Sequence, residues 1–199
     1  MKILAFSDLH MAANRAAEIT AASAEADLVI GAGDYCNMRQ GLDQVMQMLS
    51  GITAPMVVVP GNAESADELR QAANPNMTVL HGQGAMVQGL QIFGLGYAVP
   101  QTPFGGWSCD LSEDQAAALL DPCQQADIMV IHSPPKGLAD ETSTGLSIGS
   151  TAIRAAIERV QPQLMLCGHV HDCWGQSGLI GATAVHNLGP KVTWFEVAT

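Results

Sequence analysis

Residues 164–171 read LMLCGHVH, an apolar run that ends in a glycine and two histidines one residue apart. The start of the chain has the same arrangement, because the apolar run of residues 3–6 leads into Asp8 and His10. Short runs without polar residues are typical of strands buried on both faces of a parallel sheet. Strand ends in such a sheet meet along one edge, so residues far apart in the sequence can come together there. The two stretches therefore predict an α/β fold with a polar site at a sheet edge.

Three further apolar runs between these stretches also end in residues that can bind metals. Asp34 and Asn62 each follow a glycine at the end of such a run, and His132 directly follows another. Taken alone, a Gly-Asp or Gly-Asn pair is more often a turn, and a lone histidine is more often packed or solvated. Five such signals at strand ends together favour a metal site. The candidate ligands are Asp8, His10, Asp34, Asn62, His132, His169 and His171.

Seven nitrogen and oxygen donors, one of them a carboxylate that two ions can share, are enough to bind two divalent metal ions. Mixed imidazole and carboxylate ligands suit Mn, Fe, Zn or Co better than Ca. Two adjacent ions of this kind indicate hydrolysis of phosphate esters by a water that loses its proton near neutral pH. The chemistry requires no serine or cysteine nucleophile.

The first half of the sequence alternates strand-like runs with segments of helical spacing, which is typical of a parallel sheet with helical crossovers. The predicted strands are residues 3–6, 28–30 and 56–59, and the predicted helices are residues 15–25, 42–49 and 65–73.

The second half mixes short strands interrupted by glycine with two more helices. Residues 78–80, 85–87, 90–93 and 95–97 predict antiparallel strands or hairpins, and residues 183–186 and 192–197 predict a further hairpin. The remaining predicted elements are strands at residues 128–131 and 164–167, a helix capped by Ser112 and a helix over residues 151–160.

Composition limits the classes of partner and compartment. At 199 residues with 48% hydrophobic residues, we expect residues 1–199 to form one domain without a capping domain. Eight Lys and Arg against nineteen Asp and Glu give a formal net charge of −11, which argues against a nucleic-acid partner. The five cysteines form no C-x-x-C pair, and the sequence has neither a signal peptide nor an apolar run of about 20 residues. We therefore expect a cytoplasmic protein that does not enter a membrane, and its oligomeric state is left open.

The order of the five motifs resembles that of the calcineurin-like metallophosphoesterases. The resemblance extends from Asp8 to the turn at residues 187–190, and residues 132–135 (HSPP) and 168–172 (GHVHD) are most similar to small Icc-like enzymes related to class III cyclic-nucleotide phosphodiesterases. It implies an α/β fold in the form of a four-layer α/β/β/α sandwich, with two mixed β-sheets flanked by helices.

The same resemblance implies how two divalent ions are shared among the ligands. Asp8, His10, Asp34 and His171 would bind the first ion, and Asp34 would bridge to a second ion completed by Asn62, His132 and His169. The implied enzyme hydrolyses phosphodiesters or small phosphomonoesters through a metal-bridging hydroxide. In it, His132, Asn62 and His169 act catalytically, as metal ligands that position hydroxide and phosphate. Arg39 is a candidate for binding the substrate phosphate.

One departure from the family pattern affects the expected activity. Many relatives read Gly-Asn-His followed by an acid, whereas this chain reads Gly-Asn-Ala-Glu at residues 61–64, so the histidine near the leaving group is missing. We expect Glu64 to begin the following helix, and we expect His81 and His186 to be structural. The loss keeps open the alternative of a catalytically weak protein-interaction scaffold. A metal-dependent nuclease of the same fold is the other alternative, although the acidity and small size of the chain argue against it.

Overall fold

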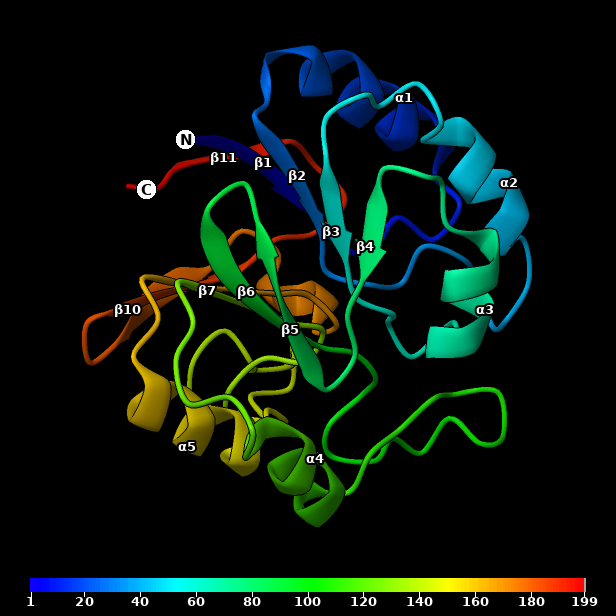
Figure 1. Ribbon diagram of the computed structural model, residues 1–199. Coiled ribbons are helices and arrows are strands. Elements are labelled where there is room, and N and C mark those ends of the chain that lie inside the picture. Colours follow the sequence, from blue (N-terminus) through cyan, green and yellow to red (C-terminus); the bar gives the residue numbers. More distant parts are fainter. Residues whose placement is uncertain (199) are drawn as a thin grey trace.

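Two β-sheets lie face to face in the middle of the protein, and helices cover the outer face of each (Figure 1). The computed structural model describes residues 1–198. Both sheets contain parallel and antiparallel strands. The predicted α/β fold, a four-layer sandwich of two mixed sheets flanked by helices, is confirmed.

The first sheet is built by the amino-terminal half of the chain and one late strand. Its strand order is β11-β1-β2-β3-β4, in which β1 to β4 are parallel and β11 is antiparallel to β1. The strands are β1 (Lys2–Phe6), β2 (Leu28–Gly31), β3 (Met56–Val58), β4 (Met77–Val79) and β11 (Thr193–Glu196). The helices on its outer face are α1 (Ala13–Ala22), which a 3₁₀ turn at Ser23–Glu25 extends, α2 (Leu42–Met48) and α3 (Ala66–Ala72).

The second sheet has the strand order β5-β6-β7-β8-β10-β9, with antiparallel strands at both edges. Its strands are β5 (Gln83–Val87), β6 (Leu90–Leu95), β7 (Ile128–Ile131), β8 (Leu164–Cys167), β9 (Ser177–Ile180) and β10 (Thr183–Asn187). Helices α4 (Glu113–Leu120) and α5 (Thr151–Val160) cover its outer face, and a short 3₁₀ helix spans His171–Cys173. Ser112 caps α4 as predicted, with its side chain accepting from Gln115 N.

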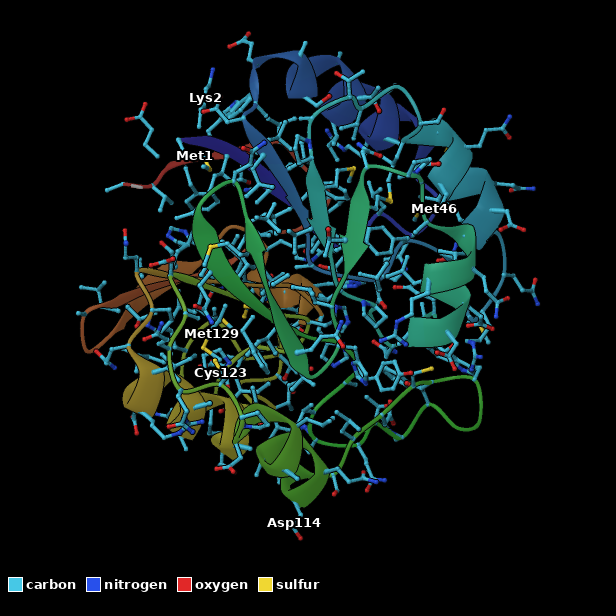
Figure 2. The ribbon with its side chains drawn as sticks, in the orientation of Figure 1. Met1, Lys2, Met46, Asp114, Cys123 and Met129 are labelled. Atoms are coloured by element: carbon cyan, nitrogen blue, oxygen red, sulfur yellow. The ribbon has the colours of Figure 1, made fainter. Side chains whose placement is uncertain are left out.

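Three apolar layers hold the sandwich together. The middle layer lies between the sheets and includes Ile30, Val57 and Val130. The outer layers lie between each sheet and its helices, where Met46 and Met129 are buried (Figure 2). Strands covered on both faces must be apolar throughout, which explains their uninterrupted apolar runs. No helix among residues 1–198 is long and apolar enough to cross a membrane.

Two predictions about strand pairing in the second half are wrong. Residues 77–79 form a fourth parallel strand beside β3, because α3 makes the crossover that a parallel connection requires. Residues 183–187 and 193–196 do not form a hairpin: β10 pairs with β8 and β9, whereas β11 crosses to the first sheet and pairs with β1. The predicted hairpin is wrong because the turn between these strands carries the chain from one sheet to the other.

One strand boundary that was predicted at a glycine is also wrong. Residues 90–95 form one strand rather than two, with Gly94 inside it. A Cβ atom at Gly94 would lie 2.4 Å from Leu80 Cβ and 2.8 Å from Val59 Cγ1. The glycine thus allows close packing between the two sheets and does not interrupt the strand.

Candidate metal centre

The seven predicted ligands lie in the loops that follow five strands, at one end of the sandwich. β1, β2 and β3 of the first sheet are followed by Asp8, His10, Asp34 and Asn62, and β7 and β8 of the second sheet by His132, His169 and His171. The donor atoms of a first group, Asp8, His10, Asp34 and His171, all lie within 4.8 Å of one another. The same holds for the donor atoms of a second group, Asp34, His132 and His169. Asp34 belongs to both groups.

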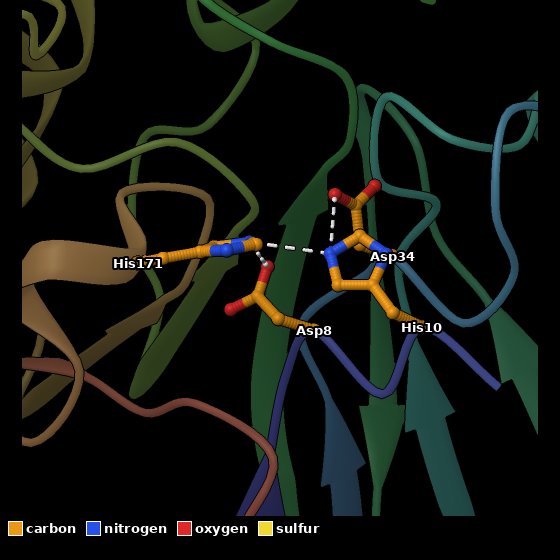
Figure 3. A group of neighbouring side chains, drawn as sticks. All are labelled: Asp8, His10, Asp34 and His171. Carbon is orange, nitrogen blue, oxygen red and sulfur yellow. Dashed lines mark hydrogen bonds and ion pairs between the residues drawn. The ribbon is translucent and has the colours of Figure 1, made fainter. Parts of the chain in front are cut away.

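In the first group, the imidazoles of His10 and His171 point toward each other, with the Asp8 carboxylate beside His171 and the Asp34 carboxylate beside His10 (Figure 3). The Nε2 atoms of His10 and His171 are 3.2 Å apart. His10 Nε2 is 3.5 Å from Asp34 Oδ2, and His171 Nε2 is 3.9 Å from Asp8 Oδ1. Ligand atoms bound at right angles to one ion, at bond lengths near 2.1 Å, lie about 3 Å apart. The donor set therefore fits one divalent ion.

The tautomer of His10 supports this interpretation. Its Nδ1 lies 3.2 Å from the carbonyl oxygen of Cys36, which can only accept, so Nδ1 donates. The lone pair of a neutral His10 is then on Nε2, which faces the group. A backbone acceptor on the far nitrogen is the usual way in which a ligating histidine is oriented.

The second group is oriented in the same way. His132 Nδ1 donates to Ala32 O at 2.8 Å, which leaves Nε2 3.5 Å from Asp34 Oδ1. The side-chain oxygen of Asn62 is 3.2 Å from His132 Nε2 and 3.0 Å from His169 Nδ1. Two nitrogens and two oxygens are thus gathered around one point, as the resemblance implied.

The side-chain amide of Asn62 has a defined orientation. Its Nδ2 donates to Ser108 Oγ at 3.0 Å, and the Ser108 hydroxyl in turn donates to Asp110 Oδ1. The amide oxygen is therefore the atom that faces the two imidazoles. Ser108 and Asp110 are functional neighbours that no sequence signal marks, since neither follows a strand.

The carboxylate of Asp8 is held by three donors. Trp174 Nε1 donates to Oδ2 at 3.0 Å, His169 N donates to Oδ1 at 3.0 Å, and the Ser7 hydroxyl donates to Oδ2. The Trp174 ring also packs against the His171 ring, with 4.3 Å between ring centroids and a tilt of 33° between the planes. Trp174 therefore supports two ligands of the first group at once.

Glu64 proves to be the main support of the loops that carry Asp34 and Asn62. Its fully buried carboxylate accepts from Gly61 N at 2.6 Å, Asp34 N at 2.9 Å and Tyr35 N at 3.1 Å. It also accepts from Cys36 N at 3.3 Å. These bonds tie the loop after β2 to the loop after β3.

The prediction that Glu64 begins a helix is therefore wrong. Helix α3 begins at Ala66, and Ser65 caps it by accepting from Glu68 N. Burial, reinforced by the charge of Asp34, raises the pKa of Glu64 to about 7, while the N–H donors of Gly61 and Cys36 act in the opposite direction. Only the tertiary structure brings these donors to one carboxylate.

The backbone at the centre is strained and closely packed. Asp8, His10, Asp34 and His169 have φ values of 53°, 44°, 56° and 67°, in the left-handed region that side chains other than glycine rarely adopt. A Cβ atom at Gly33 would lie 2.6 Å from both Gly61 N and His132 Nδ1. The glycine before Asp34 is thus required by the approach of two strand ends.

Electrostatics leave two ligands in the states that metal binding requires. Burial raises the pKa of Asp34, but the charges of His132 and His10 outweigh it, so the net shift is downward. Burial, together with the charge of His132, lowers the pKa of His169 to about 3. At neutral pH the Asp34 carboxylate is ionised and the His169 imidazole is neutral.

Comparison with known families agrees with this geometry. A family profile described as the calcineurin-like phosphoesterase superfamily domain matches residues 1–191. The chain belongs to this superfamily. The resemblance drawn from the sequence motifs is thereby confirmed.

Named relatives of this calcineurin-like phosphoesterase are distant. Metallophosphoesterase domain-containing protein 1 from Homo sapiens is 30% identical over 122 residues, which are 58% of this chain and 35% of the human protein. The chain thus spans about a third of the length of the curated relative that it matches. The fold resembles TT1561 of Thermus thermophilus (TM-score 0.73, 19% identity, covering 98% of this chain and 97% of that one). It also resembles a dimetal phosphatase from Danio rerio (TM-score 0.62, 13% identity, 96% and 88%).

Several residues considered in the sequence lie outside the centre of this phosphoesterase. The guanidinium of Arg39 makes two 2.7 Å contacts with Glu68, so its binding of a substrate phosphate remains a prediction without structural support. His81 accepts from Gly96 N and packs on Tyr97, and His186 packs on a phenylalanine of β11. Both histidines have the structural surroundings that we expected.

A cavity of about 300 Å³ opens over the ligands. Besides five of the seven ligands, its walls contain Phe104, Trp107 and Ile148. The two aromatic rings are stacked, with centroids 5.6 Å apart and planes 6° from parallel. Sequence reasoning missed these three residues because they lie in loops between elements, where no periodic pattern marks a functional side chain.

Proposed function

We propose that this protein is a dinuclear metal-dependent phosphoesterase that hydrolyses phosphodiesters or small phosphomonoesters. The observation that carries the proposal is the position of Asp34, one carboxylate that belongs to two adjoining sets of ligand atoms. An oxygen of Asp34 faces each set, Oδ2 toward His10 and Oδ1 toward His132. A carboxylate in this position can bridge two ions.

The proposed assignment follows the two groups. Asp8, His10, Asp34 and His171 would hold one divalent ion, and Asp34, Asn62, His132 and His169 would hold the other. Mn, Fe, Zn and Co suit these donors. When bound, two such ions supply a nucleophilic water of lowered pKa and neutralise charge on the phosphate. The two carboxylates do not cancel the charge of two dications, so the pocket would attract an anionic ester.

The residues of the chain provide orientation but no evident acid for the leaving group. Ala63, where many relatives have histidine, is buried, and its N–H donates to Asp34 Oδ1 at 2.8 Å. A positioned general acid contributes a factor of about 10²–10⁴ for poor leaving groups. We therefore expect aryl esters, whose leaving groups need no proton, to be hydrolysed much faster than alkyl esters.

The proposed substrate is a small molecule, and the proposed compartment is the cytoplasm. With a formal net charge of −11, the chain is poorly suited to a polyanion such as nucleic acid. Its five cysteines are all free in the structure, which suits a reducing compartment.

The decisive experiment is hydrolysis of bis(4-nitrophenyl) phosphate and 4-nitrophenyl phosphate by protein loaded with each of the four metals. Asp34→Ala should abolish turnover. Asp67→Ala is the matched control, because Asp67 is an exposed aspartate on α3 that pairs with Arg70. Absence of turnover with every metal would contradict the enzyme and favour the scaffold, and efficient cleavage of DNA at physiological salt would favour the nuclease.

A further inference from the structure

A second cavity adjoins the one above the metal ligands. It has a volume of about 540 Å³ and shares His169, Phe104 and Ile148 with the ligand cavity. The remaining walls are the loop before α4, visible between β6 and α4 in Figure 1, and the loop before α5. We call this second cavity the side groove. Its residues are Pro100, Gln101, Thr102, Pro103, Phe104, Glu113, Lys136, Ser147, Ile148, Gly149, Thr151 and His169.

The carboxylate and the ammonium group that line the side groove already have partners within the protein. The Glu113 carboxylate accepts from Ser150 Oγ, Thr151 N and Ala152 N at 2.8–3.0 Å. Lys136 Nζ donates to Ser147 O at 2.7 Å. The binding free energy of a ligand in the groove would therefore come mainly from contact with its apolar surface. Two prolines, Phe104 and Ile148 provide that surface.

Phe104 stands where the side groove meets the ligand cavity. Its side chain is 51% exposed although it stacks on Trp107. An exposed aromatic ring at that point can stack on a planar group. The volume of the side groove lies within the range of small-molecule sites and exceeds the roughly 150 Å³ that a benzene ring occupies in a protein cavity.

Continuity with the ligand cavity determines what the side groove would hold. His169 borders both, so the organic substituent of a phosphate bound over the ligands can reach the entrance of the groove. We propose that the side groove is a specificity subsite that binds an aromatic ester group of the substrate, with Phe104 and Ile148 as the contacting residues. The proposal rests on the phosphoesterase function proposed above and narrows its substrates to aromatic or nucleobase-bearing phosphate esters.

Binding of two unreactive phosphonates tests the proposal without relying on turnover. Phenylphosphonate and methylphosphonate present the same anion to the Mn²⁺-loaded protein and differ in the organic group. Calorimetric titration should show phenylphosphonate bound about tenfold more tightly, since a phenyl ring buries more apolar area than a methyl group. Phe104→Ala should reduce this preference several-fold, because it removes the aromatic surface that contacts the phenyl ring.

A control variant and two further outcomes complete the test of the side groove. Leu179→Ala removes another exposed apolar side chain, on β9 at the edge of the second sheet, and should leave the preference unchanged. Ile148→Ala should lower the preference as Phe104→Ala does. Equal affinity of the unmodified protein for both phosphonates would overturn the side-groove proposal even if nitrophenyl ester hydrolysis depends on Asp34. A preference for phenylphosphonate without any ester hydrolysis would uphold the groove and count against the proposed enzyme.

Discussion

The two ligand groups differ in how far solvent reaches them, although His10 and His132 are both oriented by a backbone carbonyl. In the group of His132 and His169, His132 is fully buried. In the group of His10 and His171, the two side chains are 28% and 49% exposed, and part of their support comes from Trp174. The contrast indicates a preorganised inner half of the centre and an outer half that solvent reaches. Asp34 couples the two.

Removing Asp34 should have the largest effect, because it is the one ligand common to both groups. Asp34→Ala should lower the bound Mn²⁺ from two ions to none at micromolar metal, whereas His171→Ala should leave one ion in the inner group. Metal analysis after gel filtration measures both. Retention of two ions by Asp34→Ala would contradict the shared-carboxylate geometry.

Removing the Glu64 carboxylate should loosen both groups through the backbone. Glu64→Ala leaves four backbone N–H groups without their acceptor, and we expect a loss of about 2–4 kcal/mol of unfolding free energy. Metal affinity should fall about 10–100-fold, as is usual when residues that position ligands are removed. Urea unfolding and Mn²⁺ titration provide the two readouts.

The control for Glu64 is Glu18→Gln, which alters an exposed ion pair with Arg15 and should change stability by less than about 1 kcal/mol. If Glu64→Ala had no more effect than this control on either readout, its role in joining the two loops would be wrong.

A chelator should remove the two metal ions at different rates. We expect the ion of the outer group to leave first, because His10 and His171 are accessible and His132 is not. The first phase should change tryptophan fluorescence, since the Trp174 indole donates to Asp8 and packs against His171. Trp174→Phe should remove most of this signal while metal analysis still shows two phases. Release of both ions in one phase would contradict the distinction between an inner and an outer half of the centre.

The smallest expected effect is on the pH dependence of stability, and it comes from His81, which lies outside both ligand groups. Burial, with the charge of Arg70, lowers the pKa of His81 to about 4, against the partly opposing charge of Asp67. Because the folded pKa lies below the unfolded value near 6.5, protons bind preferentially to the unfolded chain. The contribution of His81 to stability is therefore complete above pH 6.5 and is lost as the pH falls toward 4.

Urea unfolding of chelated protein at pH 7 and pH 5 measures this contribution by difference. The unmodified protein should lose more stability between the two pH values than His81→Asn, while other titrating groups act equally on both. Identical losses would mean that His81 titrates normally in the folded state.

Much of the fold could be predicted because it depends on local patterns. Helix α5 and strands β7 and β8 have the bounds that their apolar spacing and caps indicated, since buried strands and amphipathic helices carry their own periodicity. Strand pairing could not be read in the same way. The partner of β11 is β1, nearly the whole chain away, and no local signal distinguishes that partner from a nearby strand.

The candidate site divides along the same line. The seven candidate ligands were visible because each lies just beyond an apolar run, but the sequence did not show that these runs belong to two different sheets. The contacts of Glu64, Trp174 and Phe104 could not be predicted from the sequence, because the residues that they contact belong to distant loops.

By itself, the sequence determined the candidate ligands, their order along the chain and the family to which the chain belongs. Only the tertiary structure decided that Asp34 faces both groups, that Glu64 joins two loops and that an apolar groove adjoins the centre. Ligand chemistry is a property of single residues and their local spacing, whereas distances between loops depend on how two twisted sheets pack against each other.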